Sequence, residues 1–116
     1  MSKTFKWGII GLGKIAHKFA EMSSRIDAVE AYLNQICWSI DQGEMPVAEI
    51  SKGKFFTSKQ LEYVTSEAMQ VFGGAAYMRG NVAERAWREL KVQAIGGGSE
   101  EIMRDLAVRQ MGLAAP

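Results

Sequence analysis

The sequence has few of the residues from which disulfides and metal sites are built. Its 116 residues include one cysteine, Cys37, and one histidine, His17. A single thiol cannot close an intrachain disulfide, and a structural zinc site needs four ligands that are mostly cysteine and histidine. A lone cysteine is typical of chains from a reducing compartment, so we expect a cytoplasmic protein without a metal centre.

The chain also lacks an excess of charge of one sign and any long apolar run. Lys plus Arg is 14 and Asp plus Glu is 13, a formal net charge of +1, which disfavours a basic nucleic-acid-binding face. No apolar run approaches the roughly 20 residues that cross a bilayer, and the amino terminus lacks the pattern of a signal peptide. We therefore expect neither nucleic acid nor membrane as a partner, and one domain with one core.

The two rare residues themselves lie in uninformative surroundings. Cys37 stands in the apolar stretch 35–38, so we interpret it as a small buried hydrophobe rather than a nucleophile. His17 is flanked by Lys14 and Lys18, which indicates a solvated helix face. A general base needs an orienting partner, and none is identifiable for this histidine.

An unbroken apolar stripe predicts a long helix over residues 17–42. Its members follow one another at alternating steps of three and four residues, which places them on one helix face, and Gly43 supplies a natural stop. The stripe consists of Phe19, Met22, Ile26, Val29, Leu33, Ile36 and Ile40.

A second helix is predicted from Pro46, which suits a first helical turn, to Phe72. Lys54 and Thr57 interrupt its apolar frame, and the glycines at 73 and 74 begin a loop that runs to Gly80. The frame consists of Val47, Ile50, Leu61, Val64, Ala68 and Val71.

Two shorter helices follow. Asn81 with Glu84 three residues later resembles a capping box, and this helix runs to Ile95 with Val82, Ala86, Leu90 and Ile95 expected to face inward. Ser99 is a suitable N-cap for the last helix, with carboxylates in its first turn. Its expected apolar face is Ile102, Met103, Leu106 and Met111. The fold class is therefore all-α: an antiparallel four-helix bundle over residues 17–116, after an extended arm of residues 1–16.

The arm contains a glycine motif. Residues 5–16 read FKWGIIGLGKIA, with Gly11-x-Gly13-x-x-Ala16, and resemble the start of glucose–fructose oxidoreductase-type NAD(P) proteins. Such glycines bind a pyrophosphate only within a βαβ unit whose second strand ends in an acidic residue. Because a long helix follows here instead, we favour an arm with a glycine turn over dinucleotide binding.

Three further segments, in order, resemble the C-terminal helical domain of acyl-CoA dehydrogenases. They are HKFAEMSSRIDAVEAYLNQICW (17–38), QVFGGAAYMRGNVAERAWRE (70–89) and IGGGSEEIMRDLAVRQMGL (95–113). The resemblance implies a flavoprotein ancestry, in which a carboxylate removes an α-proton of an acyl-CoA and hydride passes to FAD. In that family the helical domain builds subunit interfaces and holds part of the FAD. The residues implied near FAD are Gln70, Gly73 and Gly74, with Ser99 and Glu101 near its other end.

The sequence departs from the family pattern where the chemistry would lie. Gly97 occupies the position at which many members carry the catalytic Glu, and the other two domains of the family are absent from these 116 residues. Ser2 and Gly13 replace an Arg and a Gln that bind FAD in the family, whereas Phe5 is kept. We therefore assign no catalytic residue.

Several charged residues have both a functional and a structural interpretation. Glu100 and Glu101 could be proposed as a base, but the first-turn dipole explains them better. Surface ion pairs explain three arginines better than phosphate binding does. These are Arg79, Arg85 and Arg88.

Two functions stay open. The first is a truncated, self-associating acyl-CoA dehydrogenase-like helical domain, a homo-oligomer without catalysis of its own, because such a bundle exposes apolar surface. The alternative is an FAD-binding component that acts with a partner dehydrogenase chain supplying the missing domains.

Overall fold

The structure is a computed structural model that describes residues 13–114, and every regular element in that range is a helix. The helices are α1 (Gly13–Asp41), α2 (Val47–Phe72), α3 (Gly74–Tyr77), α4 (Val82–Ile95) and α5 (Glu100–Gln110). The all-α class is therefore confirmed. Most of the expected arm lies outside the described residues.

The first helix begins at Gly13, four residues before the expected start at His17. Ile15 precedes Phe19 by four residues and so continues the apolar stripe by one more step. Lys14 and Ala16 are good helix formers. The residues that end the glycine motif therefore belong to α1 rather than to an extended arm.

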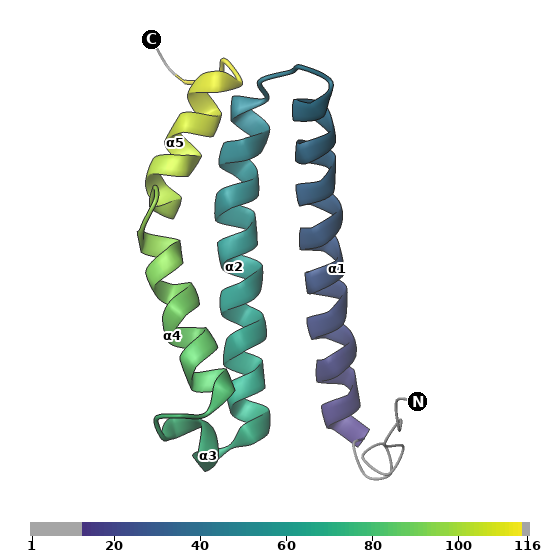
Figure 1. Cartoon of the computed structure of the whole chain (residues 1–116), viewed down its shortest axis with the longest axis vertical. Helices are drawn as coiled ribbons and strands as arrows, with labels where there is room; N and C mark the ends of the chain where they lie inside the picture. Colours follow the sequence, from purple (N-terminus) through teal and green to yellow (C-terminus); the bar gives the residue numbers. More distant parts are fainter. Residues whose placement is uncertain (1–12, 115–116) are drawn as a thin grey trace.

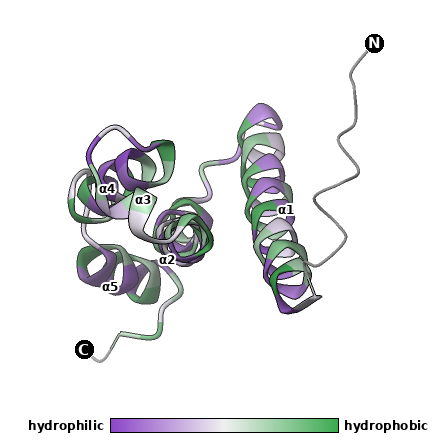
Figure 2. Cartoon of the chain, turned by 90° about the horizontal axis from the view of Figure 1, so that it is seen from below, coloured by the Kyte–Doolittle hydropathy of each residue, from purple (hydrophilic) through white to green (hydrophobic). Residues whose placement is uncertain are grey.

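The helices form three layers, with α2 in the middle. α1 runs antiparallel to α2 on one side, and α4 and α5 follow one another along the other side, both antiparallel to α2 (Figure 1). Seen along the helices, α2 separates α1 from α4 and α5 (Figure 2). The arrangement is more open than the expected four-helix bundle, because α1 packs against α2 alone. On the other side, α4 and α5, with 14 and 11 residues, together match the 26 residues of α2.

The central helix is fully buried only at small residues, whereas the predicted apolar frame is half-buried except at Ile50. Its buried positions include Ser51, Ser58 and Thr65, seven residues apart. Each hydroxyl donates to the carbonyl oxygen four residues earlier, over 2.8, 3.0 and 2.8 Å, so burial leaves none of these three donors unpaired. Ile50, a member of the expected frame, is exposed. A helix packed on two opposite sides needs small residues where its neighbours approach closely.

Gly53 lies where α1 packs closely against α2. A Cβ at this position would lie 2.7 Å from Ile36 Cδ1 and 3.9 Å from Leu33 Cδ2. A side chain at this position would therefore require the end of the Ile36 side chain to move.

The shorter helices face α2 with alanines, which corrects the expected inward faces. Ala83, Ala94 and Ala107 are buried. Four of the residues expected inside are exposed: Val82, Ile95, Ile102 and Met111. The others are half-buried: Ala86, Leu90, Met103 and Leu106. The apolar periodicity correctly predicted the helices but not which of their faces is buried. Because α2 approaches closely, the small residues of each turn face it.

The helix ends agree with most of the sequence signals. Asn81 Oδ1 accepts the Ala83 N–H over 2.8 Å at the start of α4, and Ser99 Oγ accepts the Ile102 N–H over 3.5 Å at the start of α5. Glu84 pairs with Arg88 rather than with the backbone of Asn81. Pro46 is the N-cap of α2 rather than a first-turn residue, and the expected loop after Gly73 contains the single-turn α3.

Two absences hold for residues 13–114. No helix there is both long and apolar enough to cross a bilayer. No group of three or more His, Cys, Asp or Glu side chains in the same range has the arrangement of a metal site.

Candidate functional site

A hollow of about 350 Å³ lies where α2, α3 and α4 meet. Gly73 ends α2 with φ 64° and donates its N–H to Met69 O over 3.0 Å. This left-handed conformation favours glycine and turns the chain directly into α3. The hollow is lined by Ser66, Met69, Gln70, Gly73, Ala76, Tyr77 and Trp87.

This first hollow offers flat aromatic surface beside an amide. Tyr77 is 86% exposed and Trp87 is 41% exposed, although both aromatic rings belong to residues that line the hollow. Gln70, exposed in the last turn of α2, carries two amide donors and a carbonyl acceptor. Such a combination can hold the edge of a planar polar ring.

A second, smaller hollow of about 130 Å³ lies at the start of α5. Ser99 and Glu101 line it together with Lys59 and Lys91, which contribute two ammonium groups. Cations of this kind complement phosphate oxygens. The predicted residues Ser99 and Glu101 are thus placed together by the cap of α5.

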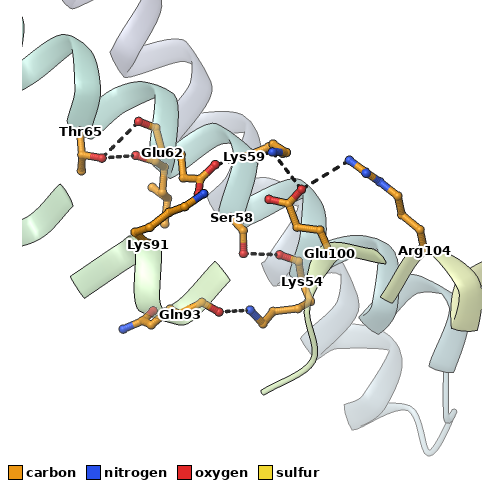
Figure 3. A network of polar contacts seen from close by, with 10 residues as sticks. Lys54, Ser58, Lys59, Glu62, Thr65, Lys91, Gln93, Glu100 and Arg104 are labelled. Carbon is orange, nitrogen blue, oxygen red and sulfur yellow. Dashed lines mark hydrogen bonds and ion pairs between the residues drawn. The ribbon is translucent and has the colours of Figure 1, made fainter. Parts of the chain in front are cut away.

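Both lysines are held by carboxylates in a polar network that joins α2 to α4 and α5 (Figure 3). Lys59 Nζ lies 2.9 Å from the buried Glu100, which Arg104 approaches at 3.6 Å. Lys91 Nζ donates to Glu62 over 2.7 Å. The Glu100 bond raises the pKa of Lys59, and the Lys91 bond lowers the pKa of Glu62. The Lys59 ammonium group therefore stays charged at the rim of the second hollow, where the ion pair of Lys91 and Glu62 also lies.

The carboxylates at this end have the character of structural groups. The backbone N–H of Glu101 and the Ser99 side chain lower the pKa of Glu101. A general base that works near neutral pH needs the opposite shift. Glu100 is paired with Lys59 and Arg104, and Gly97, with φ 68°, presents no side chain at the position where many family members keep Glu.

The structure brings the predicted FAD residues together as two groups rather than one. Gln70, Gly73 and Gly74 meet at the end of α2, whereas Ser99 and Glu101 lie at the start of α5. The 14 residues of α4 separate the two places, and a helix of that length spans about 21 Å. Only an extended ligand could reach both groups.

The remaining polar candidates have different outcomes. Arg85 pairs with Glu89 and Arg88 pairs with Glu84, at 3.3 and 2.9 Å, as expected of surface ion pairs. The expectation for Cys37 is wrong, because this residue is exposed.

Sequence reasoning missed the aromatic wall and one further groove. The sequence pattern gives no reason to pair Trp87 with Tyr77, ten residues earlier, but both residues line one hollow across the turn at Gly80. A groove of about 390 Å³ between α2 and α4 is lined partly by Leu90 and by Thr57, whose buried Oγ1 has no partner. No spacing signal in the sequence points to this groove.

Solved structures of similar proteins cover nearly all of this chain. A protein assigned as an acyl-CoA dehydrogenase in Mycobacterium smegmatis is 31% identical over 97% of this chain, with a TM-score of 0.88. One from Mycobacterium abscessus is 36% identical over 95%, with a TM-score of 0.85. An FAD complex of PigA is 25% identical over 96%, with a TM-score of 0.81. The chain spans only 30%, 29% and 29% of the lengths of these proteins.

The family model for the acyl-CoA dehydrogenase C-terminal domain matches residues 2–112. That range includes the whole glycine motif, so the same helical family accounts for it. None of the comparisons supports the resemblance to glucose–fructose oxidoreductases. The match covers almost the whole chain, and the similar structures share its helices. The chain therefore belongs to the acyl-CoA dehydrogenase family and corresponds to the C-terminal helical domain.

Proposed function

We propose that this chain is a self-associating helical module that forms one wall of an FAD site and does not catalyse dehydrogenation by itself. The observation that carries the proposal is the division of the predicted FAD residues into two groups about one helix length apart. The first hollow would take a planar ring edge between Gln70, Tyr77 and Trp87. The charged rim of the second, with Lys59 and Lys91, would face phosphate.

The residues present fit an edge of FAD better than a whole binding site. Gly73 and Gly74 have open space where a Cβ would project, so backbone can approach a ligand there without enclosing it. Both hollows open to solvent between α2 and the helices beside it, whereas a small ligand normally has most of its surface buried. FAD supplies hydride acceptance when bound; this chain would bind and orient it.

The purified chain tests this proposal through its flavin content and activity. We expect the isolated protein to retain no stoichiometric FAD and to leave acyl-CoA substrates unoxidised in the presence of an artificial electron acceptor. Tight retention of FAD together with turnover would contradict the proposal.

The alternative function, a component completed by another chain, is favoured by the aromatic first hollow. The amino-terminal and middle domains of the M. smegmatis relative, produced separately, would be mixed with this chain and FAD. If the alternative holds, flavin should co-elute with both proteins, and Trp87→Ala should weaken this retention more than Trp38→Ala, because Trp38 lies at the far end of α1. If flavin co-elutes with neither protein, this pairing is excluded.

Self-association is supported by exposed apolar surface on α1. Phe19, Ile26 and Ile40 are between 43% and 46% exposed, although they belong to the most regular apolar stripe of the sequence. Burial of such surface stabilises a complex by about 25 cal/mol per Å² before the costs of association.

A further inference from the structure

The last helix of the described range is held by one neighbour. α5 packs against α2 and makes at most marginal contact with the other described helices (Figure 1). Only two of its residues are buried, Glu100 and Ala107, whereas Ile102 and Met111 are 60% and 49% exposed. The position of α5 therefore depends on a narrow contact with α2.

The helical state of α5 depends on the same contact. The helix has 11 residues, and an isolated helix shorter than about 12–15 residues is marginal in water. Its cap bond, which the Ile102 N–H donates to Ser99 Oγ, is long at 3.5 Å. If α5 left α2, it would therefore lose its helix, and its backbone amides would exchange with solvent.

Three glycines, residues 96–98, join α5 to α4, and we call them the glycine hinge. Gly97 and Gly98 have φ values of 68° and 104°, a region that residues with a Cβ rarely adopt. A Cβ at Gly97 would meet nothing within 4 Å, whereas the Met103 side chain lies against Gly98. The backbone can therefore turn at Gly97 without a side chain in its way.

α2 holds the two sides of the glycine hinge with different lysines (Figure 3). Before the hinge, Lys54 Nζ donates to Gln93 O in the last turn of α4. After the hinge, Lys59 Nζ lies 2.9 Å from the Glu100 carboxylate. No other ion pair among the described residues joins α5 to α2. The end of α4 is thus held independently of α5.

The burial of Glu100 makes the contact with Lys59 sensitive to the loss of either partner. The Glu100 side chain is 10% exposed, against 49% for Lys59. Arg104 approaches Glu100 at 3.6 Å from within α5, and its guanidinium lies 5.3 Å from the centre of the Phe55 ring. A buried carboxylate that loses a cation is destabilised where it stands. Detachment of α5 would return that carboxylate to water.

We propose that α5 is a hinged flap, which leaves α2 as a unit about the glycine hinge while α1, α2 and α4 stay folded. Lys59 is the latch that keeps this flap closed. Three residues of the flap or its cap line the second hollow, Ser99, Glu100 and Glu101, so detachment dismantles that hollow. Control of a phosphate-facing hollow by the latch rests on the proposed function, whereas the flap itself does not.

Amide hydrogen exchange of the whole chain, resolved by peptides, tests the flap without a ligand. In the wild type, α5 should exchange at least about tenfold faster than the centres of α2 and α4. Lys59→Met removes the ammonium group but keeps an apolar stem. It should speed exchange in α5 by about a further tenfold, between the effects typical of exposed and buried ion pairs, and leave the centres of α1, α2 and α4 nearly unchanged.

Two matched lysine variants of α2 separate the latch from a general loss of charge. Lys52→Met removes a lysine that pairs with Glu49 of its own helix at 3.2 Å, and should leave exchange in α5 unchanged. Lys54→Met should speed exchange in the last turn of α4, because the Lys54 ammonium group bonds to Gln93 O. If either variant speeds α5 as much as Lys59→Met does, Lys59 is not the latch.

Oxidation of Met103 by dilute hydrogen peroxide gives a second readout of the flap. Met103 is half-buried beside the glycine hinge, whereas Met45 is 77% exposed and serves as the reference within the same chain. The initial rate of sulfoxide formation at Met103, relative to Met45, should rise in Lys59→Met because detachment exposes the thioether. An unchanged ratio would count against detachment.

Two exchange results would overturn the inference. Equal protection of α5 and α4 in the wild type would show that the two helices open together. Equal acceleration of every helix in Lys59→Met would show a loss of global stability rather than the release of a flap. The flavin tests above measure the proposed FAD wall separately, so either proposal can fail while the other stands.

Discussion

At the scale of single residues, small side chains decide how closely the helices approach. A Cβ at Gly53 would crowd the Ile36 side chain. The buried hydroxyls of Ser51, Ser58 and Thr65 each bond to a carbonyl oxygen of their own helix. The sequence pattern identified which segments are helical but not which turns face inward, because glycine, alanine and serine carry little hydropathy signal.

The contact at Gly53 yields a stability prediction. Gly53→Ala should destabilise the protein by about 1 kcal/mol, because overpacking against Ile36 typically costs 1–3 kcal/mol and alanine recovers up to about 1 kcal/mol of helix propensity. Urea unfolding followed by circular dichroism measures the change.

The matched control for Gly53→Ala removes the atom that is crowded. Ile36→Val deletes the Cδ1 that the new methyl group would meet, so the double variant should be more stable than the sum of the two single changes predicts. Strict additivity would show that Ile36 moves aside without cost.

The ion pairs of Glu62 predict how stability depends on pH. Lys91, and more weakly Lys59, lower the pKa of Glu62 below its usual value. A lowered carboxyl pKa contributes stability that is present above the usual value and is lost as pH falls through the folded-state value. The urea midpoint should therefore fall in acid, and Glu62→Gln should make that fall shallower. An equally steep fall in the variant would show that Glu62 contributes nothing measurable.

At the scale of helices, the capping signals were the most reliable feature of the sequence. Asn81 and Ser99 both cap the helices predicted from them, because a cap depends on one local hydrogen bond. Inward faces depend on where a neighbouring helix lies, and no local pattern specifies that. This is why Val82 and Ile95 are exposed although α4 itself was predicted correctly.

The cap of α4 can be tested directly. Asn81→Ala should destabilise the protein by about 1 kcal/mol, because it removes the acceptor of the Ala83 N–H. Asn34→Ala, on the exposed face of α1, is the matched control and should change stability little. Equal effects of the two substitutions would indicate that the cap bond contributes nothing.

At the scale of the whole molecule, the sequence predicted the helical class and family, and the structure added the open arrangement. The pattern of α1 suggested a helix buried along its full stripe, but part of that stripe stays exposed beside α2. The predicted FAD residues likewise divided into two groups, because α4 stands between them. The apolar pattern of one helix does not show which part of its apolar surface stays exposed for contact with another domain or subunit.

Sedimentation velocity of the purified chain over the micromolar range tests the central claim, that this is a self-associating module of an acyl-CoA dehydrogenase. We predict that the wild-type protein is a dimer that dissociates on dilution. The Ile26→Asp variant, changed at an exposed apolar position of α1, should be a folded monomer. Circular dichroism would confirm that the variant keeps its helices. A wild-type protein that sediments as a monomer throughout this range would contradict the account.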